Sequence, residues 1–588
     1  DEHVIGTRRS RIQGDGHVVG SGVMTMIQRP WFRGSLLSLL VFVLVGCGDE
    51  PLGPEAVIVE LYEAPGAPSP YEGVAFIALT VDGTDMAAPV TNVGPYVPFG
   101  GSVSVPEVPY SGPGQTRQLT VEGWADASGT LVLCRGRSIS IPVEPDGLEQ
   151  FLPILFTRVD TFVPLTSAIT LQPQQMATGR LGHTATASTT GQVVIAGGGL
   201  PDSAAEDARP WLAEGMAEVH TSIEVVDERD NGVGGHQYCN QVDCQAGVIP
   251  ANACEPTTGC MDGLNYSRAW HTATSLPTGQ IVFAGGWTLD TWGAAAPMGY
   301  VEVYTPGLGN KVDILQFSLN KPRAGHTATL LDPNTFEILF VGGDTDGEGT
   351  WEIWDPYNGT TLSGLLPDQT TRRHHTATLF DVPGAAQQAV LIAGGESDDQ
   401  VLSSALIYDA LQRNMVVQQS GMLKGARSQL SASFDPSVGF IYLIGGYTNI
   451  GHTTASSSID VYDVNRLLDP SLNEFRDDTE TLVLTTPRGG HASTAMFDGS
   501  VVITGGSSTS GNHLNTAEGI TKYLEQQADG SLVQNIKCVP LSQQMSRGRF
   551  GHRSVLTDRG TALLVGGLEG STALVSSPVY DLDSYNPK

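Results

Sequence analysis

Seven arginines recur between residues 180 and 549, and each opens a copy of one short pattern. They are Arg180, Arg268, Arg323, Arg372, Arg427, Arg488 and Arg549. A guanidinium group keeps its charge and donates paired hydrogen bonds, which suits recognition of a carboxylate or phosphate. Seven of them at one repeat position either bind an acidic ligand together or pair with the protein's own acidic residues.

Six histidines lie at the third position after these arginines. They are His183, His271, His326, His375, His491 and His552, while Leu430 takes the place in the fifth copy. A metal site needs two to four ligands that converge at about 2.1 Å on one point. One residue per repeat at a common height is instead spread around a ring, so we interpret these histidines as structural.

Two acidic clusters follow the third and fourth copies of a Gly-Gly pair. They consist of Asp344, Asp346 and Glu348, and of Glu396, Asp398 and Asp399. Loop carboxylates bind calcium, but the twelve-residue calcium loop with its terminal Glu is incomplete here. We therefore expect solvated loops and no cofactor, with calcium as the alternative.

The elements that must position these residues are short strands. Each copy runs from its Arg through an apolar strand to a Gly-Gly pair, and successive pairs are 88, 57, 52, 51, 60 and 61 residues apart. A third strand is predicted at 223–227, 301–304, 351–355, 406–409, 459–463 and 579–581, with an irregular copy around 520–523. This order resembles the kelch repeat of the galactose-oxidase-like superfamily. The resemblance implies an all-β fold in which residues 165–588 form a seven-bladed β-propeller.

The resemblance also implies where the arginines lie and how the ring closes. In kelch proteins that bind acidic peptides, arginines at this position line the mouth of the channel, so all seven are candidate ligand-binding residues. The alternative is that each pairs within its own or the next blade, because a buried unpaired guanidinium is costly. The seventh copy lacks an outer strand, and we expect residues 167–172 to supply it beside 577–582.

Enzymatic motifs are missing from the sequence. It contains no G-x-S-x-G elbow, P-loop or H-E-x-x-H. A copper radical oxidase of the galactose-oxidase type needs a Cys joined to a Tyr, and outside a cluster of four only Cys538 lies in the repeat region. A mutarotase needs only an acid and base pair in the funnel, so it stays open.

Cysteine usage indicates an oxidising compartment. Cys239, Cys244, Cys254 and Cys260 crowd into residues 229–264, an insert of the first repeat. Their spacing lacks the C-x-x-C knuckles of a zinc site, so we predict two disulfides, with zinc as the alternative.

The first fifty residues resemble a bacterial lipoprotein signal peptide. Arg29 and Arg33 precede the apolar run 35–45, which is too short to cross a bilayer as a helix, and Cys47 follows a small residue. We expect lipidation of Cys47, with an ordinary secretory signal as the alternative, and residues 1–23 as an upstream artefact. The residue after Cys47 is Gly48 and not the aspartate that can retain such lipoproteins in the inner membrane. This favours the outer membrane or cell surface.

The predicted organisation is a signal peptide within 1–46, a linker at 47–54, a β-sandwich stalk at 55–164 and the propeller. Strands are expected at 56–61, 75–79, 118–124 and 138–141 of the stalk. A net charge of -31 over 588 residues argues against a nucleic-acid partner. We therefore expect a lipid-anchored binding protein for a protein or glycan ligand. The alternative is an extracellular carbohydrate-active enzyme with its site in the funnel.

Overall fold

The computed structural model describes most of the chain and consists of β-structure. The described residues are 57–96, 115–142, 150–166, 172–201, 216–227, 263–289, 295–306, 311–343, 347–385, 387–417, 423–469, 471–477, 482–526, 532–570, 577–579 and 583–587, with short strands at 22–23, 25–26, 40–44, 104–105 and 248–250. Within them the one helix is the 3-10 helix η2 (Val464–Leu468). Over the same residues, no helix has the length and apolar character needed to span a membrane. The all-β class is confirmed.

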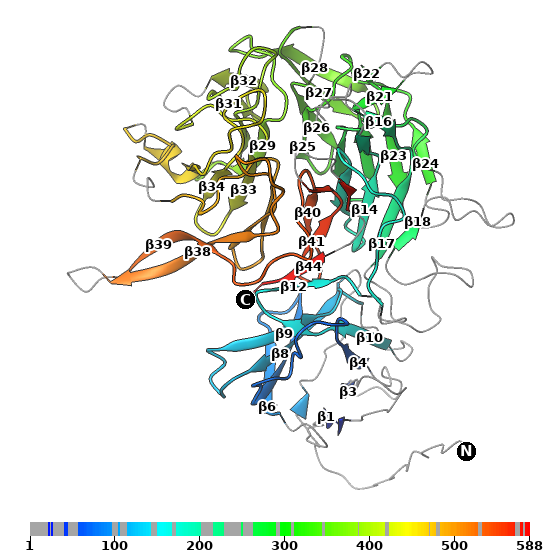
Figure 1. Cartoon of the computed structure of the whole chain (residues 1–588), viewed down its shortest axis with the longest axis vertical. Coiled ribbons are helices and arrows are strands. Elements are labelled where there is room, and N and C mark those ends of the chain that lie inside the picture. The colour runs from blue at the N-terminus through cyan, green and yellow to red at the C-terminus, as the bar shows by residue number, and fades with distance from the viewer. Residues whose placement is uncertain are drawn as a thin grey trace, which may run out of the picture.

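Each of the seven repeats forms one antiparallel sheet, here called sheets 1 to 7 (Figure 1). Sheets 1 to 3 are β13 (Thr184–Ala187), β14 (Gln192–Ala196), β17 (Ile223–Asp227) and β18 (Val248–Pro250); β19 (Thr272–Ser275), β20 (Ile281–Ala284), β23 (Val301–Thr305) and β24 (Lys311–Ile314); and β25 (Thr327–Asp332), β26 (Glu337–Val341), β27 (Thr350–Asp355) and β28 (Gly359–Leu365). Sheets 4 and 5 are β29 (Thr376–Asp381), β30 (Gln388–Ala393), β31 (Ala405–Asp409) and β32 (Asn414–Val417); and β33 (Ser431–Asp435), β34 (Phe440–Ile444) and β35 (Ile459–Asp463). Sheets 6 and 7 are β36 (Ala492–Ala495), β37 (Val501–Thr504), β38 (Ala517–Gln526) and β39 (Leu532–Pro540); and β40 (Arg553–Leu556), β41 (Ala562–Val565), β44 (Asp583–Asn586) and β12 (Thr161–Pro164).

The sheets form a closed ring. The first strand of each sheet contacts the first strand of the next, and β40 of sheet 7 contacts β13 of sheet 1. A hydrophobic cluster joins each pair of neighbours. One example packs Val282 and Val301 of sheet 2 against Phe340 and Trp354 of sheet 3. Each sheet therefore buries its faces against its two neighbours, as the repeat pattern requires.

Sheet 7 is completed by a strand from before the first repeat, but not by the predicted one. β12 pairs antiparallel with β44, with Phe162 opposite Tyr585. Residues 167–171 of the expected segment lie outside the described residues, and residues 577–578 form β43, which pairs with β42 (Leu568–Glu569) instead. Pro164 is compatible with this outermost position, since a residue without an N–H is tolerated at a sheet edge.

The Gly-Gly pairs allow neighbouring sheets to approach closely. The first glycine of each pair has φ between 54° and 65° and the second between 81° and 100°. A Cβ on Gly285 would lie 2.5 Å from the carbonyl oxygen of Arg323 and 2.7 Å from Cε1 of His326 in sheet 3. Glycine is therefore required both by its backbone conformation and by the neighbouring sheet.

The described N-terminal part contains two larger sheets and one small pair of strands. One sheet is β11 (Thr157–Arg158), β9 (Val132–Arg137), β8 (Arg117–Trp124), β5 (Phe76–Gly83) and β6 (Val90–Pro95), and the other is β10 (Gln150–Leu155), β4 (Val57–Tyr62), β3 (Leu40–Leu44) and β2 (Thr25–Met26). The small pair is β1 (Gly22–Val23) with β7 (Ser104–Val105), whereas the pairs β15 (Gly199–Pro201) with β16 (Met216–Val219) and β21 (Trp287–Leu289) with β22 (Ala295–Pro297) belong to the first and second repeats. The two larger sheets share one core, in which Leu61 packs with Leu79, Val121 and Ile154.

Two predictions for this part differ from the structure. The strand expected at 138–141 is reduced to a single bridge between Ile141 and Arg117, and the strand forms earlier, as β9. β3 falls inside the predicted signal peptide and pairs with β4. Cys47 and its lipidation lie outside the described residues.

Candidate functional site

Each of the seven repeat arginines is buried and pairs with a carboxylate of its own sheet. The pairs are Arg180–Glu224, Arg268–Glu302, Arg323–Glu352, Arg372–Asp368, Arg427–Asp460, Arg488–Glu518 and Arg549–Asp583. Six of the acids lie on the third strand of the sheet, whereas Asp368 precedes Arg372 by four residues. The side chains of all seven arginines are at most 1% exposed.

Arg323 illustrates the arrangement. Its Nη2 lies 2.7 Å from Oε1 of Glu352, and its Nη1 donates to the carbonyl oxygen of Gly342 at 2.5 Å. Burial lowers the pKa of Arg323, which the charge of Glu352 partly offsets. The ligand-binding interpretation required several guanidinium groups without protein partners, and these seven do not meet it. Apart from Arg372, whose acid is Asp368, they tie the Gly-Gly turn to the third strand.

The repeat histidines join neighbouring sheets. Nε2 of His326 lies 3.0 Å from the hydroxyl of Thr272 in sheet 2, and His271 contacts Thr184 of sheet 1 in the same way. Burial, followed by the charge of Arg323, holds the pKa of His326 well below its ordinary value. In the described part of the chain no three His, Cys, Asp or Glu side chains gather as a metal site. These contacts agree with the structural interpretation.

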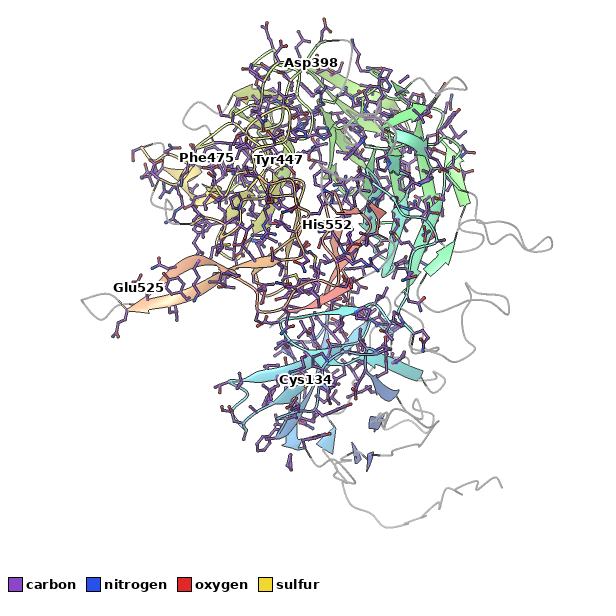
Figure 2. All side chains as sticks on the ribbon, in the orientation of Figure 1. Cys134, Asp398, Tyr447, Phe475, Glu525 and His552 are labelled. Atoms are coloured by element: carbon purple, nitrogen blue, oxygen red, sulfur yellow. The ribbon has the colours of Figure 1, made fainter. Side chains whose placement is uncertain are left out.

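A polar cavity of about 370 Å³ lies at the centre of the ring. It is lined by all seven sheets, through their first strands and the residues just before them. In Figure 2, His552 marks the interior of the ring, whereas Glu525 lies far out on the β38–β39 hairpin and Cys134 lies among the N-terminal sheets. The cavity is the candidate site.

A series of six backbone hydrogen bonds connects the residues that precede the six repeat histidines and Leu430. These residues are Gly182, Trp270, Gly325, His374, Gln429, Gly490 and Gly551, and all have φ between 48° and 68°. Each N–H from Trp270 onward donates to the carbonyl oxygen of the corresponding residue in the preceding sheet, at 2.7 to 3.2 Å. This position therefore has a left-handed backbone in all seven sheets, whether or not the residue is glycine.

Three of these seven positions carry side chains where glycine would fit better. Trp270, His374 and Gln429 all line the cavity. A left-handed residue with a Cβ costs about 1–2 kcal/mol, and such strain gathers at functional sites. Trp270 and His374 contact each other edge to face, with ring centroids 5.5 Å apart. Burial lowers the pKa of His374 to about 4, so its imidazole is neutral at pH 7.

Arg553 is the cation of the cavity. It follows the repeat histidine of sheet 7, where the other sheets carry small residues: Thr184, Thr272, Thr327, Thr376, Ser431 and Ala492. Its Nε donates to the carbonyl oxygen of His183 at 2.9 Å. No carboxylate of the described residues pairs with Arg553, and no Asp or Glu is among the described residues that line the cavity. Burial alone lowers its pKa.

A buried polar network lies behind Gln429. Oε2 of Glu396 lies 2.7 Å from Nε2 of His452, and Oε1 lies 3.3 Å from Nε of Arg373. Glu396 is 1% exposed, so the solvated loop expected there is wrong for this residue. Asp398 pairs with Arg373 and Glu348 with Lys321, while Asp344 and Asp346 lie outside the described residues. The two acidic clusters do not form a shared calcium loop among the described residues.

The two cysteines within the described residues do not fit the copper radical centre. Cys134 and Cys538 are both free, and burial raises the pKa of each to about 12. Sγ of Cys538 lies 3.7 Å from Oε2 of Glu518, and neither Cys nor Tyr is among the described residues that line the cavity. Cys239, Cys244, Cys254 and Cys260 lie outside the described residues, so their pairing stays a prediction.

Comparison with known proteins adds only distant structural likeness. No family model matches the sequence, and no curated protein is similar to it. A structure titled "Structure of YjhT" aligns with 61% of this chain and 99% of its own, at 13% identity and a TM-score of 0.39. A novel fungal alcohol oxidase of the AA5 family, in complex with copper, aligns with 70% of this chain and 75% of its own, at 14% identity and a TM-score of 0.42.

At these scores neither likeness carries an argument about this chain. Its own fold and site define an all-β protein with a ring of antiparallel sheets around a polar central cavity.

Proposed function

We propose that the protein is a seven-bladed kelch-type β-propeller on a β-sandwich stalk, and that its central cavity binds a carboxylate-bearing ligand. The observation that carries this proposal is Arg553, a cation in the cavity without an acidic partner among the described residues. The protein has 62 Asp and Glu residues, and because none of the described ones pairs with this buried guanidinium, we propose that a ligand supplies the anion.

The remaining cavity residues suit a ligand of limited size. A volume of about 370 Å³ is at the lower end of the range for small-molecule sites. Trp270 offers an aromatic surface, and His374 and Gln429 offer neutral hydrogen-bonding groups. We propose a small glycan or the acidic group of a protein as the natural ligand class.

The proposed setting is the bacterial cell envelope. Lipidation at Cys47 would anchor the chain to the outer membrane or cell surface, with the N-terminal sheets as a stalk. Two disulfides would hold the insert 229–264. Both proposals rest on the sequence pattern, and intact-mass measurement of protein made with its signal peptide tests them together.

The carbohydrate-active alternative would use the same cavity. Neutral His374 could then accept a proton from a bound sugar. Chemical conversion of a bound probe, followed by NMR, would favour this enzyme over a binding protein.

Arg553→Thr tests the binding site directly, because threonine stands at the equivalent position of sheets 1 to 4. The probes are D-glucuronate and cyclohexanecarboxylate, which carry a carboxylate, and D-glucose, which does not. We expect the wild type to bind both acids and not glucose. The substitution should weaken acid binding by roughly 10- to 100-fold, since a hydrogen bond to a charged group is worth about 1.5–3 kcal/mol.

Arg413→Thr is the matched control, because Arg413 is 42% exposed and pairs with Glu337 on the outside of the ring. It should leave calorimetric titrations of both acids unchanged. Equal affinity of wild type and Arg553→Thr for the acids, or binding of glucose as tightly as glucuronate, would contradict the proposal.

A further inference from the structure

A chain of buried hydrogen bonds links the cavity to the loops of two sheets. Glu396 follows the Gly-Gly pair of sheet 4, and His452 lies in the loop between β34 and β35 of sheet 5. Nε2 of His452 contacts Glu396 at 2.7 Å, and its Nδ1 contacts Nε2 of Gln429 at 3.2 Å. The ring of Tyr447 stacks on His452 at 5.0 Å. Gln429 is thus held from behind by two residues outside the cavity lining.

Glu396 determines which groups donate and which accept along this series of hydrogen bonds. Its burial acts to raise the pKa, but hydrogen bonds from His452 and Ser428 and the nearby histidines lower it to about 2. Glu396 is therefore ionised and can only accept, so His452 carries its proton on Nε2. The amide nitrogen of Gln429, which can only donate, lies 3.2 Å from Nδ1 of His452, so Nδ1 accepts this hydrogen bond.

At the cavity, this arrangement fixes Oε1 of Gln429 as a hydrogen-bond acceptor. Since the amide nitrogen of Gln429 is engaged by His452, Oε1 is the atom left for a ligand. Oε1 lies against Gly490, 3.1 Å from the position that a Cβ would take there, and Gly490 lines the cavity. Arg553 supplies hydrogen-bond donors and positive charge in the same cavity. A ligand would therefore meet a donor at Arg553 and an acceptor at Gln429.

We propose that Glu396 and His452 are positioning residues that hold Gln429 as an acceptor, and that the ligand is a hydroxylated carboxylic acid of monosaccharide size. Its carboxylate binds Arg553 and one hydroxyl donates to Oε1 of Gln429. This inference rests on the proposed function, because Arg553 must first bind the carboxylate. Sites that hydrogen-bond a hydroxyl discriminate strongly against analogues without it.

The test is the ratio of two affinities, measured by calorimetry on the full chain. D-Glucuronate carries hydroxyls on its ring, whereas cyclohexanecarboxylate has the same carboxylate and ring size without them. We expect the wild type to prefer glucuronate by about fivefold or more, in line with one net hydrogen bond. Gln429→Met should bring the ratio close to one and leave the affinity for cyclohexanecarboxylate unchanged.

The chain offers a matched control for this substitution. Gln369 also has a left-handed backbone, with φ 53°, but is exposed on a turn outside the cavity. Gln369→Met should keep the wild-type ratio. His452→Ala should lower the ratio as Gln429→Met does, whereas His452→Gln, which can still donate to Glu396 and accept from Gln429, should retain most of it.

The outcomes separate the two proposals. If neither acid binds the wild type, the carboxylate site itself is wrong. If both acids bind through Arg553 with equal affinity, or if the preference survives Gln429→Met, the acceptor role of Gln429 is wrong while the carboxylate site stands. If His452→Ala keeps the preference in a folded protein, the positioning role of His452 and Glu396 is overturned.

Discussion

Arginine takes two different roles in this molecule, and the difference lies in the partners of the guanidinium group. Arg323 is almost completely buried and meets Glu352 and the carbonyl oxygen of Gly342 within its own sheet. Arg553 lies in the cavity and has no acidic partner among the described residues. The same residue type thus holds a sheet together in one place and, in our proposal, binds the carboxylate of a ligand in another.

Replacing a repeat arginine should damage stability rather than binding. Arg323→Ala would leave Glu352 buried without its partner, and we expect the free energy of unfolding to fall by about 3–5 kcal/mol. The exposed pair of Arg413 and Glu337 serves as the control, and Arg413→Ala should cost less than about 1 kcal/mol. Denaturant unfolding measures both. Loss of glucuronate binding without loss of stability in Arg323→Ala would restore the ligand-binding interpretation.

Part of the candidate site could have been predicted from the sequence. Arg553 departs from the small residues found after the other repeat histidines, and this departure is visible when the copies are aligned. The acidic partners also recur, two residues before the aromatic residue of the third strand, as in Glu302 and Tyr304. By contrast, the contact between Glu396 and His452 joins loops of different sheets, 56 residues apart, and no repeat position marks it.

At the scale of elements, four of the five third strands predicted with an aromatic residue lie where they were expected. β23, β27, β31 and β35 lie where the apolar pattern indicated. The seventh was misplaced, because Tyr580 imitated the pattern and the true strand, β44, begins with Asp583 and carries Tyr585. The acid that pairs with Arg549 would have identified it, since an acid two residues before an aromatic occurs at 583–585 and not at 579–581.

The buried histidines just before the first strands make the free energy of unfolding depend on pH. Burial lowers the pKa of His491 to about 3, whereas in the unfolded chain it is near 6.5. Between these values the unfolded chain binds a proton that the folded one does not. The free energy of unfolding therefore decreases as the pH falls below 6.5, by about 1.4 kcal/mol per pH unit for this one group.

His491→Leu tests this dependence and copies the residue that sheet 5 carries, Leu430. We expect the slope of stability against pH to fall by about 1.4 kcal/mol per unit between pH 6.5 and 4. Ser431→Ala removes the hydrogen bond to Nε2 of His491 and keeps the imidazole, so its slope should match the wild type. Urea unfolding at several pH values measures the slopes, and an unchanged slope in His491→Leu would contradict the linkage.

At the scale of the whole molecule, β12 belongs to the ring rather than to the N-terminal sheets. Its pairing with β44 covers the edge of sheet 7, and Tyr585 packs on Phe162 with ring centroids 4.8 Å apart. The predicted boundary at residue 164 divides the two parts on the wrong side of this strand. Apolar alternation favoured 167–172, whereas in 161–164 the apolar residues Phe162 and Val163 are adjacent, so the pattern did not mark the strand that forms.

A pair of fragments tests the closure. One that begins at residue 157 keeps β12, and one that begins at residue 167 loses it. We expect the shorter fragment to melt at lower temperature and to associate through the exposed edge of β44. Differential scanning calorimetry and light scattering measure the two effects. Equal melting temperatures and two monomeric fragments would show that β12 is dispensable.

The partners at the closure are separated by 425 residues along the chain, as the hydrogen bond from Tyr585 to Asp160 shows. A ribosome adds about 5–20 residues per second, so β12 emerges roughly 20 to 85 s before β44. During this interval sheets 1 to 6 can assemble in order, but the last seam cannot form. An interrupted synthesis therefore always yields an open ring, whose unpaired edge distinguishes an unfinished chain from a finished one.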